Sequence, residues 1–588
     1  MDFIVQGTLQ AVKALYSTEL KESDINLQET RKEFEGEITI VTFPLTRVSK
    51  KSPEQTGSEI GEYLKEHRPE ISGFNVIKGF LNLSLDSTYL LQVFSDTISN
   101  SAFGDIPSNG KKVMVEYSSP NTNKPLHLGH IRNNLLGYSV AQILAASGYE
   151  VIKANLVNDR GIHICKSMLA WQRFGNGETP KSSGLKGDHL VGKYYVIFDK
   201  EYKKQIDELK AQGQTEEDAR KNAPLIKEAQ LMLRKWEAGD EEVISLWKMM
   251  NNWVYEGFDV TYKKLGVSFD KYYYESGTYL LGKDIIEEGL EKGVFFRKED
   301  NSVWIDLTAD ALDEKLVLRG DGTSVYITQD LGTAQLKYND FKMDESIYIV
   351  GNEQDYHFKV LFLILNKLGK SWAQGLYHLS YGMVDLPSGK MKSREGTVVD
   401  ADDLIDEMID TARGRTEELG KVEGLPEEEK QNLYRMIGLG ALKYFLLKVE
   451  PKKRLLFDPN ESIDFQGHTG PFIQYTHARI RSVLSKAGIE KPEYVGINSV
   501  SPTERELILA LSKYPSVLTE SAKEFSPAQL ANYAYDLAKL YNKFYHEEPI
   551  LKVEDINIRN FRLSLSSVTA SIIRKSMGLL GIEVPERM

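Results

Sequence analysis

Cysteine is nearly absent from this chain of 588 residues, in which Cys165 is the only one. A single cysteine excludes a disulfide framework and any zinc site built from several cysteine ligands. His163 lies two positions before it, but two ligands do not close a metal site. We therefore expect no structural zinc and no resident metal.

Long apolar runs are also lacking. The longest, Val360–Leu365, is far shorter than the ~18 residues that a membrane-spanning helix requires. The opening residues, MDFIVQGTLQ, have neither the positive charge nor the apolar stretch of a signal peptide. Together with the scarcity of cysteine, these absences predict a cytoplasmic protein without a membrane partner.

Positive charge is not in excess, since 73 lysines and arginines stand against 85 aspartates and glutamates, for a net charge of −12. Indiscriminate binding to nucleic acid depends on neutralising phosphates, so the composition argues against it. A specific nucleic-acid partner held by a local basic face stays possible. The hydrophobic content of 41% and the charged content of 27% are ordinary for a globular protein, and the length suffices for roughly three or four domains.

Composition and periodicity divide the chain. Residues 1 to about 104 form a first unit that ends in the strand-like stretch 75–85, and the glycines and proline of 104–112 predict a linker. Helical spacing over about 165–300 predicts a mostly helical insertion. From about residue 401 onward the pattern is almost entirely helical.

The centre of the chain reads as a βαβ unit. Residues 113–119 and 149–157 predict two strands, and the apolar stripe that starts at Ile131 predicts a helix between them that ends near Gly148. Such a crossover requires a parallel sheet. Beyond the insertion, the sequence predicts strands at 324–330 (SVYITQD) and 346–352 and a helix at 357–369.

The loop between the first of these strands and the helix reads SSPNTNKPLHLGH (118–130). Ligands bind at the carboxyl ends of parallel strands, and helix N-termini favour anions. Gly129 lets a flat ring or a phosphate approach the backbone, and His127 and His130 can donate hydrogen bonds to phosphate oxygens. A metal pair and plain surface polarity are the alternatives. No third or fourth metal ligand is evident, so the pattern favours nucleotide binding.

A basic cluster follows in GKMKSREGTVV (389–399), where Lys390, Lys392 and Arg394 lie between glycines. A solvated basic loop is the simpler interpretation. Such a loop could also stabilise charge that moves onto a pyrophosphate leaving group, provided that the fold brings it to the first loop.

Acidic and aromatic residues form a third group, with Glu116 on the first strand and Tyr326 and Asp330 in SVYITQD. Carboxylates at strand ends could hold a guanidinium by bidentate pairing. Ordinary strand-edge acids are the alternative. Gln354 and His357 follow another predicted strand and could face the same cleft.

The motifs HLGH and KMKSR resemble the two signature motifs of class I aminoacyl-tRNA synthetases, and the whole chain resembles the arginyl-tRNA synthetases. The resemblance covers nearly the full length. The segments that carry it are KGFLNLSL (78–85), SSPNTNKPLHLGH (118–130), GPFIQYTHARIRS (470–482), YAYDLAKLYNKFYH (533–546) and LLGIEVPERM (579–588).

The resemblance implies a multidomain α/β protein. A small α+β domain over 1–108 would bind the corner of tRNA, and a Rossmann-type catalytic domain with a parallel sheet would span 109–400, with the helical insertion at about 165–300. A helical stem over 401–465 and an all-helical anticodon-binding domain over 466–588 would follow. Members of the family are usually monomers.

The implied activity is that of an arginine–tRNA ligase. The carboxylate of L-arginine attacks the α-phosphorus of ATP, which carries Mg²⁺, and pyrophosphate leaves. The arginyl group then passes from the adenylate to the terminal ribose of tRNA(Arg), and AMP leaves. No covalent enzyme intermediate forms, so catalysis rests on positioning and electrostatic stabilisation.

The site residues follow from matching motifs. The ATP-binding residues would be Pro125, His127, Leu128, Gly129, His130, His357, Lys392 and Ser393. The arginine-binding residues would be Glu116, Ser118, Asn121, Tyr326, Asp330 and Gln354. Catalysis would fall to His127, His130, Lys124, Lys390 and Lys392. Contact with tRNA would fall to Phe80, Asn82, Phe472, Tyr475, Tyr545 and Met588. For the aromatic residues, core packing is the alternative to stacking on unpaired bases.

The second motif departs from the common family pattern K-M-S-K-S, because this chain has K-M-K-S-R. Arginyl enzymes often relax this motif, and a lysine upstream of the first motif is thought to compensate. Lys124 occupies that place, so the sequence leaves open whether it, Lys390 or Lys392 carries most of the charge stabilisation. A class I synthetase for another amino acid, an RNA-binding relative without catalysis and a simple nucleotidyltransferase are the rival interpretations.

Overall fold

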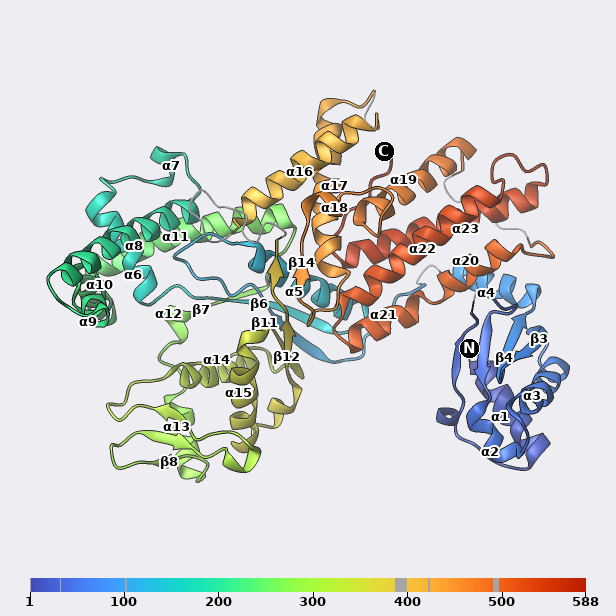
Figure 1. The fold of residues 1–588 in the computed structure, drawn as a ribbon, viewed down its shortest axis with the longest axis horizontal. Helices are drawn as coiled ribbons and strands as arrows, with labels where there is room; N and C mark the ends of the chain where they lie inside the picture. Colours follow the sequence, from blue (N-terminus) through green and yellow to red (C-terminus); the bar gives the residue numbers. More distant parts are fainter. Residues whose placement is uncertain (1, 32, 101–102, 387–398, 421–423, 490–495) are drawn as a thin grey trace. The chain divides into compact units, whose positions relative to one another are not determined.

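The computed structural model describes residues 2–31, 33–100, 103–386, 399–420, 424–489 and 496–588. The chain forms two compact units (Figure 1). One unit comprises Met1–Gly104, Arg479–Pro515 and Asp536–Ile572, and the other comprises Asp105–Ala478, Ser516–Tyr535 and Ile573–Met588. Over the described ranges, no helix combines the length and the apolar character needed to cross a membrane.

The first unit contains an antiparallel sheet of order β1-β2-β4-β3. Its last two strands form a hairpin where the sequence predicted a single strand over 75–85. Lys78 and Gly79 make the turn, both with positive φ, at 51° and 77°. The strands are β1 (Leu27–Glu29), β2 (Ile38–Val41), β3 (Ile71–Ile77) and β4 (Phe80–Leu85).

Helices from both ends of the chain pack together within this unit. Arg505 donates from Nε to an oxygen of Glu37 at 2.7 Å and from a second nitrogen to Ser87 Oγ at 3.2 Å. Phe94 meets Phe561 edge-on, with ring centroids 5.4 Å apart. The helices concerned are α1 (Asp2–Tyr16), α2 (Thr46–Ser49), α3 (Pro53–His67), α4 (Ser87–Ser99), α20 (Pro502–Ser512) and parts of α19 (Gly470–Ala487), α22 (Pro527–Glu547) and α23 (Ile556–Leu579).

The second unit is built on a five-stranded parallel sheet of order β12-β11-β5-β6-β7. Its strands are β5 (Lys112–Glu116), β6 (Glu150–Val157), β7 (Lys271–Tyr274), β11 (Glu345–Gly351) and β12 (Leu376–Tyr381). Helix α5 (Leu128–Ala146) makes the crossover from β5 to β6, and β11 leads into α15 (Asp355–Lys367), as predicted. The side chains of Val113, Met114 and Val115 are fully buried, as expected for a central parallel strand covered on both faces.

The predicted helical insertion includes a strand of the core sheet. Helices of the insertion pack side by side (Figure 1), but β7 pairs with β6 at the sheet edge. Its four residues KYYY are too few to show a period in the sequence. The helices are α6 (Ile162–Phe174), α7 (Pro180–Ser183), α8 (Gly187–Ala211), α9 (Glu216–Asn222), α10 (Pro224–Glu237) and α11 (Glu241–Leu265).

A small lobe follows β7 and packs on α15 (Figure 1). It holds an antiparallel sheet of order β10-β9-β8 and shares a hydrophobic core with α14 and α15. Its elements are α12 (Glu275–Thr278), α13 (Lys283–Glu291), β8 (Phe296–Arg297), β9 (Val303–Ile305), β10 (Lys315–Leu318) and α14 (Tyr326–Phe341).

The strand predicted at 324–330 is wrong, because α14 begins at Tyr326. The alternating residues of SVYITQD imitate a strand, but Thr328 caps the helix by accepting a hydrogen bond from the backbone N–H of Val325 at 3.1 Å. Ile327, Leu331 and Ala334 are then buried at helical spacing. Tyr326 and Asp330 therefore lie one turn apart on a helix.

The remainder of this unit is almost entirely helical, as predicted. The exception is a short parallel pair, β13 (Val384–Asp385) with β14 (Leu455–Leu456). The helices are α16 (Ala401–Glu418), α17 (Glu427–Leu447), α18 (Pro459–Ser462), α21 (Tyr514–Lys523) and the remaining parts of α19, α22 and α23.

Candidate active site

The HLGH loop forms the N-terminus of α5. His127 is the N-cap residue, and its Nδ1 accepts a hydrogen bond from the backbone N–H of Gly129 at 3.1 Å. Nδ1 of His130 accepts from the backbone N–H of His127 at 3.2 Å. A neutral imidazole that accepts at Nδ1 carries its proton on Nε2, so both histidines have Nε2–H groups as donors.

Burial keeps these histidines neutral. It lowers the pKa of His127 to about 4, with a smaller contribution from the charge of Lys124. It also lowers the pKa of His130 well below the ordinary value, with His127 and Lys124 adding to the effect. Near pH 7 the pair therefore offers N–H donors without positive charge.

The loop that precedes the histidines is held in an uncommon conformation. Ser118 and Ser119 have φ values of 79° and 44°, which residues other than glycine rarely adopt. The N–H of Ser118 donates to Asn133 Oδ1 at 2.5 Å, and the N–H of Ser119 donates to Asn155 Oδ1 at 3.1 Å. These side chains hold the strained turn, while the neighbouring Asn121 is exposed.

Lys124 and Pro125 lie on the path from this turn to α5. Lys124 is half-buried, and burial lowers its pKa. Helix α8 passes close by, since a Cβ on Gly192 would lie 2.8 Å from Pro125 Cδ. Leu128, at the start of α5, is buried.

Lys390, Lys392, Ser393 and Arg394 lie outside the described residues, but the chain immediately after them reaches the first loop. The N–H of Leu128 donates to the carbonyl of Val399 at 3.1 Å, and the N–H of Ala401 donates to the carbonyl of Leu126 at 3.0 Å. Backbone hydrogen bonds thus join the first loop to residues 271 and 275 positions further along the chain (399 − 128 and 401 − 126).

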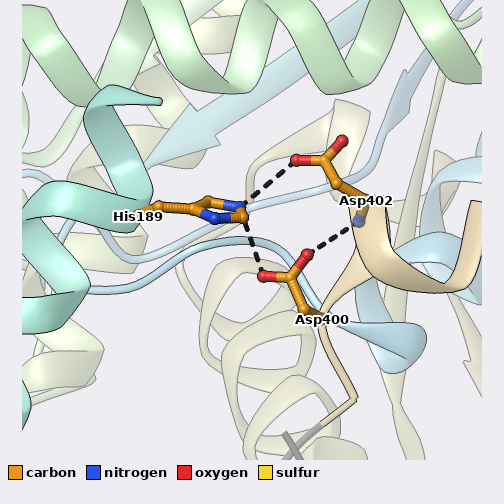
Figure 2. A group of neighbouring side chains, drawn as sticks. All are labelled: His189, Asp400 and Asp402. Carbon is orange, nitrogen blue, oxygen red and sulfur yellow. Dashed lines mark hydrogen bonds and ion pairs between the residues drawn. The ribbon is translucent and has the colours of Figure 1, made fainter. Parts of the chain in front are cut away.

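A cluster of side chains lies at this junction (Figure 2). Nε2 of His189 lies 3.3 Å from a carboxylate oxygen of Asp400 and 3.3 Å from one of Asp402. The backbone N–H of Asp402 donates to Asp400 at 2.8 Å. Burial alone would lower the pKa of His189. The pKa is nevertheless raised, because Asp402 and Asp400 favour the charged ring.

These three residues have the composition of a metal site, which the sequence did not indicate. Lys186 forms an ion pair with Asp402 and lies 3.1 Å from Asp188. The carboxylates are therefore already balanced by the protein's own cations, and we interpret the cluster as an ion-pair network.

Three residues of the predicted arginine site lie near one another. Glu116 ends β5, and Tyr326 and Asp330 lie one turn apart at the start of α14. The negative charges of Asp330, Glu275 and Glu116 all raise the pKa of Tyr326. His357 bonds Asp330, with 2.6 Å between Nε2 and Oδ2, and its ring lies 5.0 Å from that of Tyr326. The residue predicted to bind ATP thus contacts the predicted arginine pocket.

Two further predicted residues flank this group. Gln354 is half-buried in η4 (Asn352–Gln354), the turn after β11. Ser118 is buried, and its hydroxyl lies 2.7 Å from the hydroxyl of Tyr262.

Glu116 is paired with a residue that sequence reasoning missed, the buried Lys337 of α14. Because 324–330 was read as a strand, Lys337 was not placed on the helical face that carries Asp330.

The predicted tRNA-binding residues have different surroundings. Asn82 is buried; its Oδ1 accepts from Thr39 at 2.6 Å and its amide donates to Asn75 at 2.8 Å. Phe80, in contrast, packs edge-on with the exposed Phe43, with ring centroids 5.7 Å apart. Within the first unit, therefore, Phe80 is the better candidate for contact with RNA.

In the C-terminal helices, the ring of Tyr545 is 38% exposed, and the guanidinium of Arg479 lies 5.1 Å from its centroid. Phe472 and Tyr475 are half-buried on α19, and the ring of Phe472 lies 5.2 Å from that of Tyr535. Met588 is half-buried at the chain end.

Comparisons with known proteins identify the family of the chain. A family model for the catalytic domain of class I tRNA synthetases (R) matches residues 95–458, and a model of the DALR anticodon binding domain matches residues 473–588. An arginine–tRNA ligase of Bacteroides thetaiotaomicron is 58% identical over 594 residues, which cover 100% of this chain and 99% of that protein. One of Flavobacterium psychrophilum is 58% identical over 577 residues, or 96% of each chain. The solved structure of Thermus thermophilus arginyl-tRNA synthetase matches with a TM-score of 0.80 and 26% identity over 100% of both chains. The chain therefore belongs to the class I arginyl-tRNA synthetase family.

Proposed function

We infer that this arginine–tRNA ligase activates arginine with ATP at the carboxyl edge of its parallel sheet. The observation that carries the inference is a pair of N–H-donating histidines, His127 and His130, at the start of the helix that follows β5, the strand that ends at Glu116. Tyr326 and Asp330 add a second carboxylate and an aromatic ring beside Glu116. The first group suits phosphates and the second suits a cation.

ATP enters as its magnesium complex, with its phosphates at the N-terminus of α5. His127 and His130 donate from Nε2 to phosphate oxygens, and Gly129 leaves room for the nucleotide to approach the backbone. Because both imidazoles are neutral, they orient ATP without competing with Mg²⁺ for the phosphate charge. Pro125 and Leu128 shape the loop, and Ser393 belongs to the second motif.

Arginine places its cationic groups against Glu116 and Asp330, with Tyr326 and Gln354 at the sides and Ser118 and Asn121 at the strained turn. A neutral analogue such as citrulline leaves these carboxylates without a positive partner. A site rejects a substrate analogue strongly when the analogue leaves a buried polar group of the site unpaired, by roughly 10⁴-fold in favourable cases.

The arginine carboxylate then attacks the α-phosphorus, and negative charge accumulates on the departing pyrophosphate. Lys124 lies next to the histidines and is the described cation best placed to stabilise that charge. Lys390 and Lys392 are further candidates on the second motif. In the second step the terminal ribose hydroxyl of tRNA attacks the arginyl carbonyl, and AMP leaves.

For tRNA, the half-buried Phe80 and the exposed Phe43 beside it offer aromatic surface in the N-terminal unit, with Arg31 5.9 Å from the ring centroid of Phe80. Asn82 would support that strand from inside rather than touch the nucleic acid. Phe472, Tyr475, Tyr545 and Met588 are proposed contacts of the C-terminal domain, where stacking on unpaired bases would supply affinity.

The proposed pocket is tested by ATP–pyrophosphate exchange with single amino acids, in the presence of an unfractionated tRNA pool. Arginine should support exchange, whereas lysine, glutamine and citrulline should not. Asp330→Asn should raise the KM for arginine by roughly 10–100-fold, since a hydrogen bond to a charged group is worth about 1.5–3 kcal/mol. Robust exchange with another amino acid would refute the assignment of the pocket.

A cytoplasmic location and a monomeric state are the remaining parts of the proposal. Light scattering coupled to size-exclusion chromatography measures the second directly. A mass near 66.7 kDa is expected, and a mass near twice that value would contradict it.

A further inference from the structure

Lys337 has no place in the mechanism outlined above, yet it forms an ion pair with Glu116 of the proposed arginine pocket. Its side chain is 2% exposed and that of Glu116 is 6% exposed, and the two form an ion pair. Glu116 ends β5, whereas Lys337 lies in the fourth turn of α14. The pair therefore joins the helix that carries Tyr326 and Asp330 to the strand that carries Glu116.

The surroundings of Lys337 keep its ammonium charged. Its Nζ lies 4.9 Å from the ring centroid of Tyr348 and 5.9 Å from that of Tyr273, which are distances at which aromatic faces attract cations. Burial alone would lower the pKa of Lys337, but the nearby Glu116 and Tyr348 outweigh it, so the pKa is raised.

Stability does not account for such a pair. Replacing a buried ion pair with apolar groups is often neutral or favourable, because desolvation offsets the attraction. Removing one partner alone is costly, because it leaves the other charge buried without compensation. What the pair does supply is a fixed carboxylate at a defined place.

The helical spacing extends the argument to the other carboxylate. Asp330 and Lys337 are seven residues apart, two turns along the same face of α14. Asp330 also adds to the negative potential at Lys337. The charges of Asp330, Glu275 and Glu116 all act on Tyr326, and the ammonium of Lys337 offsets part of this negative charge.

We propose that Lys337 is a positioning residue for arginine recognition. It engages one oxygen of Glu116, which holds the carboxylate in place beside the substrate, and its charge offsets part of the negative charge of the pocket. This inference rests on the proposed function, because it assigns Lys337 a role in the same arginine site.

The test compares Lys337→Met with Lys337→Arg in exchange assays that contain tRNA. Lys337→Met has nearly the same length without the charge, and it should raise the KM for arginine at least tenfold while the KM for ATP stays within about twofold. Lys337→Arg keeps the charge and should recover most of the affinity. If Lys337→Met leaves the KM for arginine unchanged, or raises both KM values alike, the proposal is overturned.

Rescue by the conservative variant separates positioning from a purely structural effect. If the KM for arginine of Lys337→Arg is raised as much as that of Lys337→Met, the charge of residue 337 is not what positions Glu116.

A double variant completes the design. Glu116→Gln combined with Lys337→Met should bind arginine no more weakly than Glu116→Gln alone, since Lys337 acts through Glu116. Additive losses would contradict the proposal. If wild type itself shows no exchange with arginine, the proposed function fails instead. Lys337→Arg, which keeps the pair intact, serves as the folded comparison if Lys337→Met proves unstable.

Discussion

The backbone N–H of His127 donates to Nδ1 of His130 at 3.2 Å, so the two signature histidines are bonded to each other through the first turn of α5. This bond fixes the ring of His130 and leaves Nε2 as its protonated nitrogen. It also requires His130 to be neutral, because a protonated Nδ1 could not accept.

Acid should therefore weaken the fold through this pair. The pKa of His127 is lowered to about 4 and that of His130 lies well below its ordinary value near 6.5. Between the lowered folded pKa values and the ordinary value, the unfolded chain binds more protons than the native chain. The free energy of unfolding therefore rises with pH from about 4 to 6.5, and above pH 6.5 the two histidines no longer destabilise the fold. When the pH is lowered from 7 to 5, the midpoint of thermal unfolding should fall less in His130→Gln than in wild type, by on the order of 2 °C. An equal loss in both would contradict this account.

Lys124→Ala should lower kcat of ATP–pyrophosphate exchange by roughly 10²-fold with little change in the KM for arginine, because Lys124 acts on charge that develops in the transition state. Lys124→Arg keeps that charge and should retain more activity. If Lys124→Ala leaves exchange untouched, the idea that this lysine compensates for the relaxed second motif is wrong.

Arg132 should be essential for stability, since it ties α5 to the segments around β13 and β14. Its guanidinium donates to the carbonyls of Gly382 and Lys453, both at 2.9 Å, and to that of Pro451 at 3.1 Å, and its side chain is fully buried. Lysine cannot reach all of these carbonyls, and each buried acceptor left alone costs about 1–3 kcal/mol. Arg132→Lys should lower the midpoint of thermal unfolding by several degrees. A midpoint within 1 °C of wild type would contradict the assignment, and the exposed Arg220 provides a matched Arg→Lys control.

His189 should stabilise the junction of α8 and α16 more at low pH than at high pH, the reverse of the effect of His127 and His130. Its pKa is raised, so its contribution is fully present below about 6.5, the unfolded value, and is lost as the pH rises through the higher folded value. His189→Gln should therefore lower the unfolding midpoint more at pH 6 than at pH 9. An equal loss at both values would contradict the ion-pair interpretation. An increase of the wild-type midpoint with Zn²⁺ that His189→Gln abolishes would indicate a metal site.

Much of the catalytic unit could be predicted from local patterns. The crossover β5–α5–β6 follows from two apolar strands and one apolar stripe, and the nucleotide-binding role proposed for the HLGH loop rests on its place between them. The prediction of a strand at 324–330 was wrong because Thr328 caps the N-terminus of α14 by a hydrogen bond to the backbone of Val325. The alternation of apolar and polar residues does not reveal this bond. That error concealed Lys337, whose partner Glu116 lies 221 positions away. The cluster around His189 could not be predicted for a similar reason, because only the tertiary fold brings Asp400 and Asp402 close to this histidine.

The central claim is that the HLGH loop holds ATP for arginine activation. Arginylation of a tRNA pool by wild type, His130→Ala and His67→Ala tests it most directly, with the exposed His67 on α3 as the matched control. We predict that His130→Ala lowers the initial rate by at least 10²-fold, while His67→Ala stays within about twofold of wild type. Equal rates in wild type and His130→Ala would contradict the account.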